Sequence, residues 1–165
     1  MDYNNIVVVP FTPSFTNQLA SMIVHIQQNE FGLPISAKDQ PDLFDIKNFY
    51  QNGNGNFWIA VHNKEVIGSI AIIDIGNNQV ALRKMFVHHQ YRGKDTGTAH
   101  ILFDALLSWT KEKLVKNIYL GTTEKMYAAQ RFYKNKGFVE IHKAELPKSF
   151  PLMEVDSKFY LLINE

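Results

Sequence analysis

Basic and glycine residues are concentrated in one short segment, residues 90–97, which reads Gln-Tyr-Arg-Gly-Lys-Asp-Thr-Gly. The apolar run before it, residues 79–87, is typical of a strand, and the apolar-periodic segment from Thr98 is typical of a helix. The first backbone N–H groups of a helix have no intrahelical partner and lie at the positive end of its dipole. The segment is therefore predicted to be a turn that binds an anion such as a phosphate group.

A P-loop is the competing explanation for a glycine-bearing phosphate site. Its pattern requires a glycine five residues before Gly93 and a Ser or Thr after Lys94. The chain has His88 and Asp95 at these positions, so a P-loop is excluded. Asp is a good N-cap and tolerates a left-handed backbone, so the turn could keep its shape with the Asp95 side chain folded back onto the helix N-terminus, and we expect anion binding to be tolerated.

Metal and thiol chemistry have no support in the sequence. The chain has no cysteine, which excludes disulfides, thiolate zinc sites and a cysteine nucleophile. His88 and His89 are adjacent and are expected to point to opposite faces of extended backbone. We therefore expect no metal site, because no metal-ligand spacing occurs among the six histidines, His25, His62, His88, His89, His100 and His142.

Length and composition indicate an ordinary globular protein. The chain has 165 residues, 45% of them hydrophobic and 20% charged, and is expected to form one domain over 1–165. A net charge of +1 argues against a nucleic-acid partner. No membrane association is expected, because no apolar segment approaches the length of a bilayer span and the N-terminus does not resemble a signal peptide. A cytoplasmic location is expected.

The remaining elements must position the turn. Hydrophobic periodicity and turn residues predict a helix pair after the first strand, then an antiparallel meander of three strands that ends at the turn. Strands are expected over 6–10, 57–61, 65–75, 79–87 and 117–120, from 138 onward and over 159–162. Helices are expected over 13–28, from 41, from 98 and over 125–135. This order predicts an α+β fold rather than a Rossmann domain, in which strands and helices alternate throughout.

Two segments carry a family resemblance. Residues 92–99 resemble the Arg/Gln-x-x-Gly-x-Gly/Ala turn of the GCN5-related N-acetyltransferases (the GNAT family), which holds the pyrophosphate of acetyl-coenzyme A. Residues 129–138 resemble the Ala-x-x-Phe-Tyr-x-x-x-Gly-Phe segment of the same family. Either motif alone is weak, whereas two in the right order are much stronger. With the flanking strands, the resemblance covers roughly residues 56–141.

The resemblance implies a fold and a reaction. The fold is the acyl-CoA N-acyltransferase (GNAT) fold, a mixed, mostly antiparallel twisted sheet of about seven strands flanked by about four helices. The reaction moves acetyl from acetyl-CoA to a primary amine of a small molecule, amino acid or peptide, by direct attack in a ternary complex. Acetyl-CoA is then the acetyl-donor co-substrate and no metal is needed. A monomer or a homodimer is compatible with the family.

The resemblance also implies the binding residues for acetyl-CoA. Its pantetheine arm pairs with the backbone of a strand edge, and its pyrophosphate lies on the amides of the turn, where Arg92 and Lys94 add positive charge. Asp95 departs from the family pattern, because it stands where glycine is usual. The implied cofactor-binding residues are Met85, Phe86, Val87, Arg92, Gly93, Lys94, Asp95, Thr96, Gly97 and Thr98.

Tyr133 matches the family tyrosine that lies near the cofactor sulfur. A phenol at that place can protonate the departing thiolate as a general acid. The neighbouring Phe132 is roughly 100° away around the helix, so we expect Phe132 to point into the core and Tyr133 to face the cleft. Packing is the alternative role for this tyrosine.

The acceptor side is less determined. Arg83 and Lys84 alternate on their strand, so one is expected to face the cleft; Arg83 there could bind a carboxylate of the acceptor, and a surface ion pair is the alternative. Many relatives have a glutamate base in register with Ala81, where alanine cannot act. The general base stays open among Glu30, Asp39, Asp42, His62, His88 and a chain of water molecules.

Two other functions compete with catalysis. A non-catalytic module that binds or senses acyl-CoA is suggested by Asp95 and by the missing carboxylate at Ala81. A scaffold that has lost the cofactor is the second alternative. The family residues that the chain retains argue against it: Arg92, Gly93, Gly97 and Tyr133.

Overall fold

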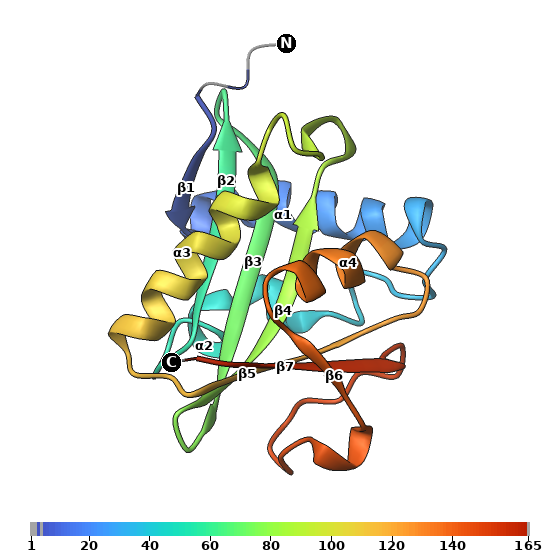
Figure 1. The fold of residues 1–165 in the computed structure, drawn as a ribbon. Coiled ribbons are helices and arrows are strands. Elements are labelled where there is room, and N and C mark those ends of the chain that lie inside the picture. The colour runs from blue at the N-terminus through green and yellow to red at the C-terminus, as the bar shows by residue number, and fades with distance from the viewer. Residues whose placement is uncertain (1–2, 4, 165) are drawn as a thin grey trace.

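One mixed sheet of seven strands forms the centre of the computed structural model, which describes residue 3 and residues 5–164 (Figure 1). The strand order across the sheet is β1-β2-β3-β4-β5-β7-β6. The strands are β1 (Val7–Pro10), β2 (Asn56–His62), β3 (Glu65–Gly76), β4 (Gln79–Val87), β5 (Asn117–Thr122), β6 (Val139–Ile141) and β7 (Lys158–Ile163). The α-helices are α1 (Thr16–His25), α2 (Ile46–Phe49), α3 (Thr98–Glu112) and α4 (Tyr127–Asn135). The predicted α+β class, sheet and helices are confirmed.

The two predicted helices of the N-terminal region are less regular than expected. A 3-10 turn, η1 (Pro13–Phe15), precedes α1, and a π-helical turn, η2 (Ile26–Glu30), follows it. The second helix is interrupted at Asp45, which separates the 3-10 turn η3 (Pro41–Phe44) from α2. Two further 3-10 turns lie at η4 (His89–Tyr91) and η5 (Lys143–Glu145).

Tight turns set the register of the antiparallel meander. Asn63 and Lys64 join β2 to β3, and Asn77 and Asn78 join β3 to β4, all four with positive φ. Two consecutive left-handed residues form the type of turn whose twist matches that of paired strands. Strands β1 to β4 therefore pair antiparallel in chain order.

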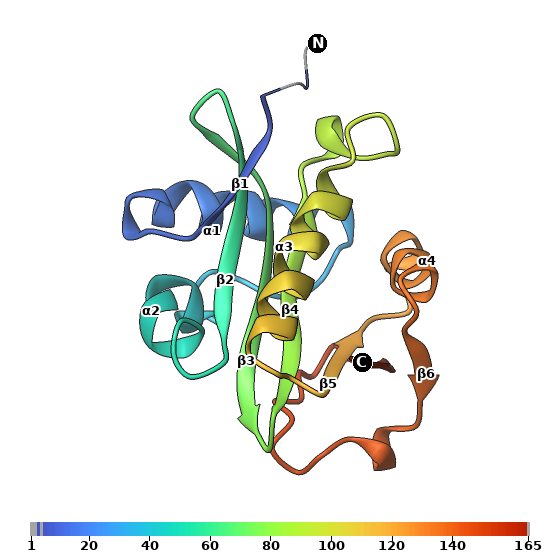
Figure 2. The same cartoon turned by 60° about the vertical axis from the view of Figure 1, so that its left-hand side comes forward.

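The helices cover both faces of the sheet. Figure 2 shows α1 and α2 on one face of the β1–β4 meander and α3 on the other. Leu19, Ile23 and Tyr50 are fully buried on the first side, and Leu102 and Leu106 on the second. No helix in the described part of the chain is long and apolar enough to cross a membrane.

Strands β4 and β5 form the parallel pair, and they separate after four residues. Their pairing runs from Gln79↔Asn117 to Leu82↔Leu120. Beyond Leu82, β4 continues to Val87 while β5 pairs on its other side with β7. Figure 1 shows the two strands diverging, with α4 lying over the gap. The edge of β4 from Arg83 to Val87 therefore has no strand beside it in the described part of the chain.

A β-bulge lies in β4 where this edge begins. Ser69 pairs with Phe86 and Ala71 with Arg83, so Lys84 and Met85 together oppose one residue of β3. Lys84 has a φ of 55°, and its carbonyl accepts a hydrogen bond of 2.6 Å from the Ser69 hydroxyl. A bulge breaks the alternation of side chains along a strand. The prediction that Arg83 and Lys84 point to opposite sides is therefore wrong, because the Arg83 guanidinium lies 5.9 Å from the centre of the Tyr50 ring and the Lys84 ammonium pairs with Asp42, to which the Tyr50 hydroxyl donates.

The buried Lys84 side chain connects β4 to the segment before α2. Its Nζ lies 3.6 Å from Asp42 Oδ2 and donates a 2.5 Å hydrogen bond to Gln40 Oε1. The Tyr50 hydroxyl donates to the same Asp42 carboxylate, and the amides of Gln27 and Gln40 bond to each other. A buried charge is tolerated when it is paired and hydrogen-bonded. This network, residues 27, 40, 42, 50 and 84, fixes the segment against the bulge.

Replacing Lys84 with Met should change how stability depends on pH. Burial, with Arg83 adding to it and Asp42 opposing it, lowers the pKa of Lys84 from 10.5 to about 8. Between these values the unfolded chain binds a proton that the folded chain has released, so stability rises with pH. From pH 7.5 to 9.5 the free energy of unfolding of the wild type should rise by about 1–2 kcal/mol relative to Lys84→Met. Urea unfolding at each pH measures it.

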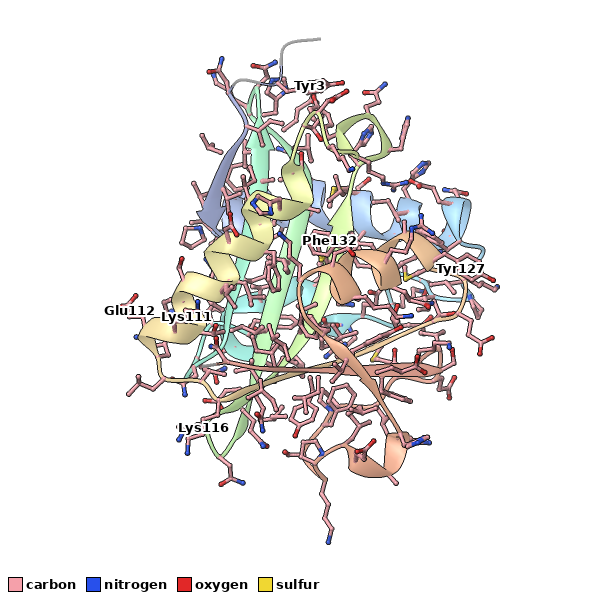
Figure 3. The ribbon with its side chains drawn as sticks, in the orientation of Figure 1. Tyr3, Lys111, Glu112, Lys116, Tyr127 and Phe132 are labelled. Carbon is pink, nitrogen blue, oxygen red and sulfur yellow. The ribbon has the colours of Figure 1, made fainter. Side chains whose placement is uncertain are left out.

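The matched control is Lys116→Met, which removes an exposed lysine (Figure 3). The stability of the wild type relative to this variant should not change over the same pH range. An equal pH response for the two variants would contradict the burial of a charged Lys84.

Candidate active site

Two cavities lie along the free edge of β4. The first, the turn cavity, has a volume of about 240 Å³ and lies between β4, the turn before α3 and α4. The second, the wedge cavity, has a volume of about 110 Å³ and lies where β4 and β5 separate. Met85, Phe86, Met126 and Ala129 line both cavities, so the two are neighbours along one strand edge.

Glycines give the turn before α3 its shape. Gly93 has a φ of 99° and Gly97 a φ of 62°, a region that side chains disfavour. Gly97 is the N-cap of α3, and its N–H donates to the Gly93 carbonyl at 3.2 Å. The Thr96 hydroxyl closes the turn by donating to the Tyr91 carbonyl at 2.6 Å. The predicted helix N-terminus thus begins at Thr98, directly after the second glycine.

Asp95 has a different place from the one expected. Its φ is not positive, and Gly97 rather than Asp95 is the N-cap. The side chain is exposed and bonds to no other described residue. The two glycines take both left-handed positions, so the turn does not need Asp95 to fold back. The expectation of a capping Asp95 is therefore wrong.

Arg92 is held beside the turn by two contacts. Its Nε donates to the Val87 carbonyl at 2.7 Å, and its Nη2 lies 2.7 Å from Glu30 Oε1 at the end of η2. Arg92 and Gly93 line the turn cavity with three residues of β4. Of the ten residues predicted to bind cofactor, this cavity is lined by Met85, Phe86, Val87, Arg92 and Gly93. Lys94, Asp95, Thr96, Gly97 and Thr98 form the turn and the start of α3 without lining it.

Tyr133 and Phe132 of α4 each line one cavity. Tyr133 lines the wedge cavity but is only 5% exposed, packing on Phe138 and Tyr160. Burial raises the pKa of its phenol, which therefore keeps its proton at neutral pH. Phe132 is half-buried, packs against Phe103 and lines the turn cavity (Figure 3). Phe132 thus packs against the core as expected and also lines the turn cavity, whereas Tyr133 lines the wedge cavity and is itself part of the buried core.

Arg83 presents a half-buried cation to the wedge cavity. Its Nη2 contacts Met153 Sδ at 3.2 Å, and its guanidinium carbon lies 5.9 Å from the centre of the Tyr50 ring. Within the described residues, no carboxylate lies close enough to form an ion pair with it. The alternative of a surface ion pair does not match this geometry.

None of the five side chains considered as general bases lines the wedge cavity. Glu30 pairs with Arg92, and Asp42 is in the buried network. The Ser36 backbone N–H and hydroxyl bond to Asp39 and lower its pKa, which makes it a weaker base. These candidates lie in separate environments, so their spacing in the sequence could not identify which of them acts as the general base.

No histidine lines the wedge cavity in the described part of the chain. The ring of His62 is buried and its Nδ1 lies 2.9 Å from the Tyr91 hydroxyl. His88 stacks on His89 with ring centres 4.5 Å apart, contrary to the expected divergence, because His89 starts the 3-10 turn η4. The described residues contain no group of three side chains suited to hold a metal ion.

Sequence reasoning missed Asp156, which lines the wedge cavity. The segment between η5 and β7 has no hydrophobic period, so nothing in the sequence connects it with β4. Ala81, in contrast, does not line the cavity and is buried against Tyr119 and Phe159.

Comparisons with known proteins agree with this geometry. The model of the acetyltransferase (GNAT) family matches residues 20–138. The crystal structure of a GNAT-family acetyltransferase from Staphylococcus aureus Mu50 has a TM-score of 0.93 and 40% identity, covering 97% of this chain and 99% of that one. An N-acetyltransferase of Thermoplasma acidophilum, solved in complex with coenzyme A, shares the fold at 13% identity and a TM-score of 0.75, covering 96% of this chain and 99% of that one.

Among curated proteins, the N-acetylaspartate synthetase of Xenopus tropicalis is 36% identical over 108 residues, which are 63% of this chain and 38% of that protein. The chain spans less than half the length of the first curated relatives that it matches. The family model nevertheless covers most of the chain, including the turn, β4 and α4. With its sheet, its turn and its matched region in agreement, the chain belongs to the GNAT family of acetyltransferases.

Proposed function

We propose that this protein transfers an acetyl group from acetyl-CoA to a primary amine by direct attack in a ternary complex. The observation that carries the proposal is the pair of cavities along one free strand edge, with the anion-binding turn at one end and Tyr133 at the other. This arrangement matches the shape of a cofactor with a phosphate-bearing part, an extended arm and a reactive end.

The cofactor arm would pair with the backbone of β4. In the described part of the chain no strand pairs with residues 85–87 on the side where β5 has turned away, although the Val87 carbonyl already accepts a hydrogen bond from Arg92 Nε. The pyrophosphate would lie on the first amides of α3, at the positive end of the helix dipole. Arg92 would add charge there after exchanging its contact with Glu30 for one with phosphate.

Tyr133 would act as the general acid. Attack of the amine on the thioester carbon gives a tetrahedral intermediate, whose collapse breaks the C–S bond and expels a thiolate. Tyr133 lines the wedge cavity, and its phenol would give its proton to this sulfur. Direct attack fits a chain without cysteine, because a thiol acyl-enzyme cannot form.

The acceptor would carry a carboxylate as well as an amine. Arg83 supplies an unpaired, half-buried guanidinium in the wedge cavity, and such a fork binds carboxylates with two parallel hydrogen bonds. The curated relative named as an N-acetylaspartate synthetase supports an amino acid as the acceptor. A module that binds acyl-CoA without turnover is the competing function, and thiol release distinguishes the two.

A glutamate at position 99 should block the anion site without harming the fold. Ala99 is in the first turn of α3 and lines the turn cavity, and acidic residues stabilise a first turn. Ala99→Glu should weaken acetyl-CoA binding at least about tenfold in calorimetry, since its carboxylate would compete with the pyrophosphate. The control is Ser108→Glu, the same residue introduced on an exposed site later on the same helix. Equal affinity in both variants would place the pyrophosphate elsewhere.

Freeing Arg92 should strengthen cofactor binding. The Glu30–Arg92 pair must break before the guanidinium can reach a phosphate, and a pair this exposed is weak. Glu30→Gln should therefore lower the dissociation constant of acetyl-CoA about two- to fivefold. Glu112→Gln makes the same charge change at the far end of α3 and should leave the constant unchanged (Figure 3). Weaker binding by Glu30→Gln would show that the pair supports the bound state.

Removing the phenol should slow the chemical step. Tyr133→Phe keeps the ring that packs on Phe138, so cofactor affinity should stay within about twofold. The kcat for thiol release should fall about 10²–10⁴-fold, the usual contribution of a general acid. Tyr127→Phe, on an exposed part of α4, is the control (Figure 3). An unchanged kcat would remove Tyr133 from the mechanism, and no thiol release from the wild type with any amine would favour the non-catalytic module.

A further inference from the structure

One carboxylate lines the wedge cavity in the described part of the chain, and it belongs to Asp156. It comes from the loop that leads into β7, whereas the cation in the cavity, Arg83, comes from β4. The cavity also contains Tyr133 of α4, the proposed acid. An acid, a cation and a carboxylate from three separate elements therefore meet where the sheet opens.

The Asp156 carboxylate is held in place on several sides. Its Oδ2 accepts a hydrogen bond of 3.1 Å from the Met153 N–H, and its own N–H donates to the Met153 carbonyl at 3.1 Å. The next residue, Ser157, donates its N–H to the Thr122 carbonyl at the end of β5, at 2.8 Å. Oδ2 lies only 2.6 Å from the point where a β-carbon on Gly121 would be. A glycine in β5 thus makes room for this carboxylate beside the split in the sheet.

The surroundings of Asp156 favour a base. Burial raises its pKa, while the Met153 N–H and the charge of Arg83 act in the opposite direction. A raised pKa makes the ionised carboxylate a better proton acceptor. The other charged or titratable groups that line the cavity are Arg83, Lys84 and Tyr133. Lys84 is paired with Asp42, so Arg83 is the cation left to bind a ligand.

We propose that Asp156 binds the ammonium group of the acceptor and accepts its proton, so that Asp156 and Arg83 together select a small acceptor with both an amine and a carboxylate. The proposal rests on the proposed acetyl transfer and adds its missing base. A zwitterion would place one charge on each of the two side chains, which come from different elements. Neither charge would then be left buried without a partner.

The proton balance of the reaction is complete with these groups. Asp156 takes one proton from the ammonium, and the neutral amine forms a C–N bond with the thioester carbon. Collapse breaks the C–S bond, Tyr133 gives its proton to the sulfur, and the proton still on the nitrogen restores the phenol. Asp156 then releases its proton to solvent. The net products are the amide, coenzyme A with a free thiol, and one proton.

The test measures thiol release from acetyl-CoA with the standard L-amino acids, and with spermidine and 2-phenylethylamine as amines without a carboxylate. The wild type should acetylate at least one amino acid in preference to both amines. Asp156→Asn should lower kcat/KM for that amino acid about 10²–10⁴-fold and leave acetyl-CoA binding unchanged in calorimetry. Asn keeps an oxygen for the Met153 N–H. Glu154→Gln, an exposed change on the same loop, is the matched control.

The pH profile separates a base from a residue that only holds the loop. In the wild type kcat/KM should rise with pH as Asp156 ionises. This acid limb of the profile should disappear in Asp156→Asn and persist in Asp156→Glu. The Glu variant also tests the base if the Asn variant does not fold. An unchanged rate and acid limb in Asp156→Asn would overturn the proposal. Turnover of the carboxyl-free amines alone would overturn it and leave acetyl transfer intact. Absence of acetyl-CoA binding would instead refute the proposed function.

Discussion

The separation of β4 from β5 after Leu82 is the constraint on which the rest of the site depends. A strand edge inside a protein has backbone donors and acceptors that must find partners, and another strand usually supplies them. Here β5 turns away to pair with β7, from Leu120↔Tyr160 to Thr122↔Lys158. The edge of β4 thus has no strand beside it in the described part of the chain, where an extended ligand would pair, and α4 lies over the gap (Figure 1).

The bulge at Lys84 brings two basic side chains to this edge. A left-handed lysine is strained, and such strain persists where surrounding contacts determine the conformation. The contacts are the Ser69 hydroxyl on the Lys84 carbonyl, and Asp42 and Gln40 on its side chain. Because the bulge ends the alternation, Arg83 and Lys84 share the wedge cavity. The same network fixes the segment before α2, so the acceptor side is attached to the strand that would hold the cofactor.

The sequence predicted the parts of the structure that depend on local patterns. Hydrophobic periodicity located the sheet and helices, and the glycines at 93 and 97 located the turn, because each signal is complete within a few residues. The bulge was not predictable, because the sequence around Arg83 and Lys84 is that of a strand with normally alternating side chains. The contacts that stabilise the strained backbone of Lys84 come from residues 40, 42 and 69, which are distant in the sequence. The Glu30–Arg92 pair and the Asp156 carboxylate depend on contacts between segments more than 30 residues apart, for which one sequence contains no signal.

The charged side chains around the wedge cavity fall into two groups that differ in burial. Lys84 and Asp42 neutralise each other within the fold, so their buried pair contributes rigidity and no net charge to a ligand. Arg83 and Asp156 are only half-buried and form no ion pair with another described residue, so they keep their charges for the cavity. Because Arg83 is fixed in the sheet and Asp156 lies on the loop before β7, the distance between them depends on that loop. If the two side chains bind the acceptor as proposed, the conformation of this loop would set the length of the acceptor, whereas the regular strand β4 would set the cofactor site.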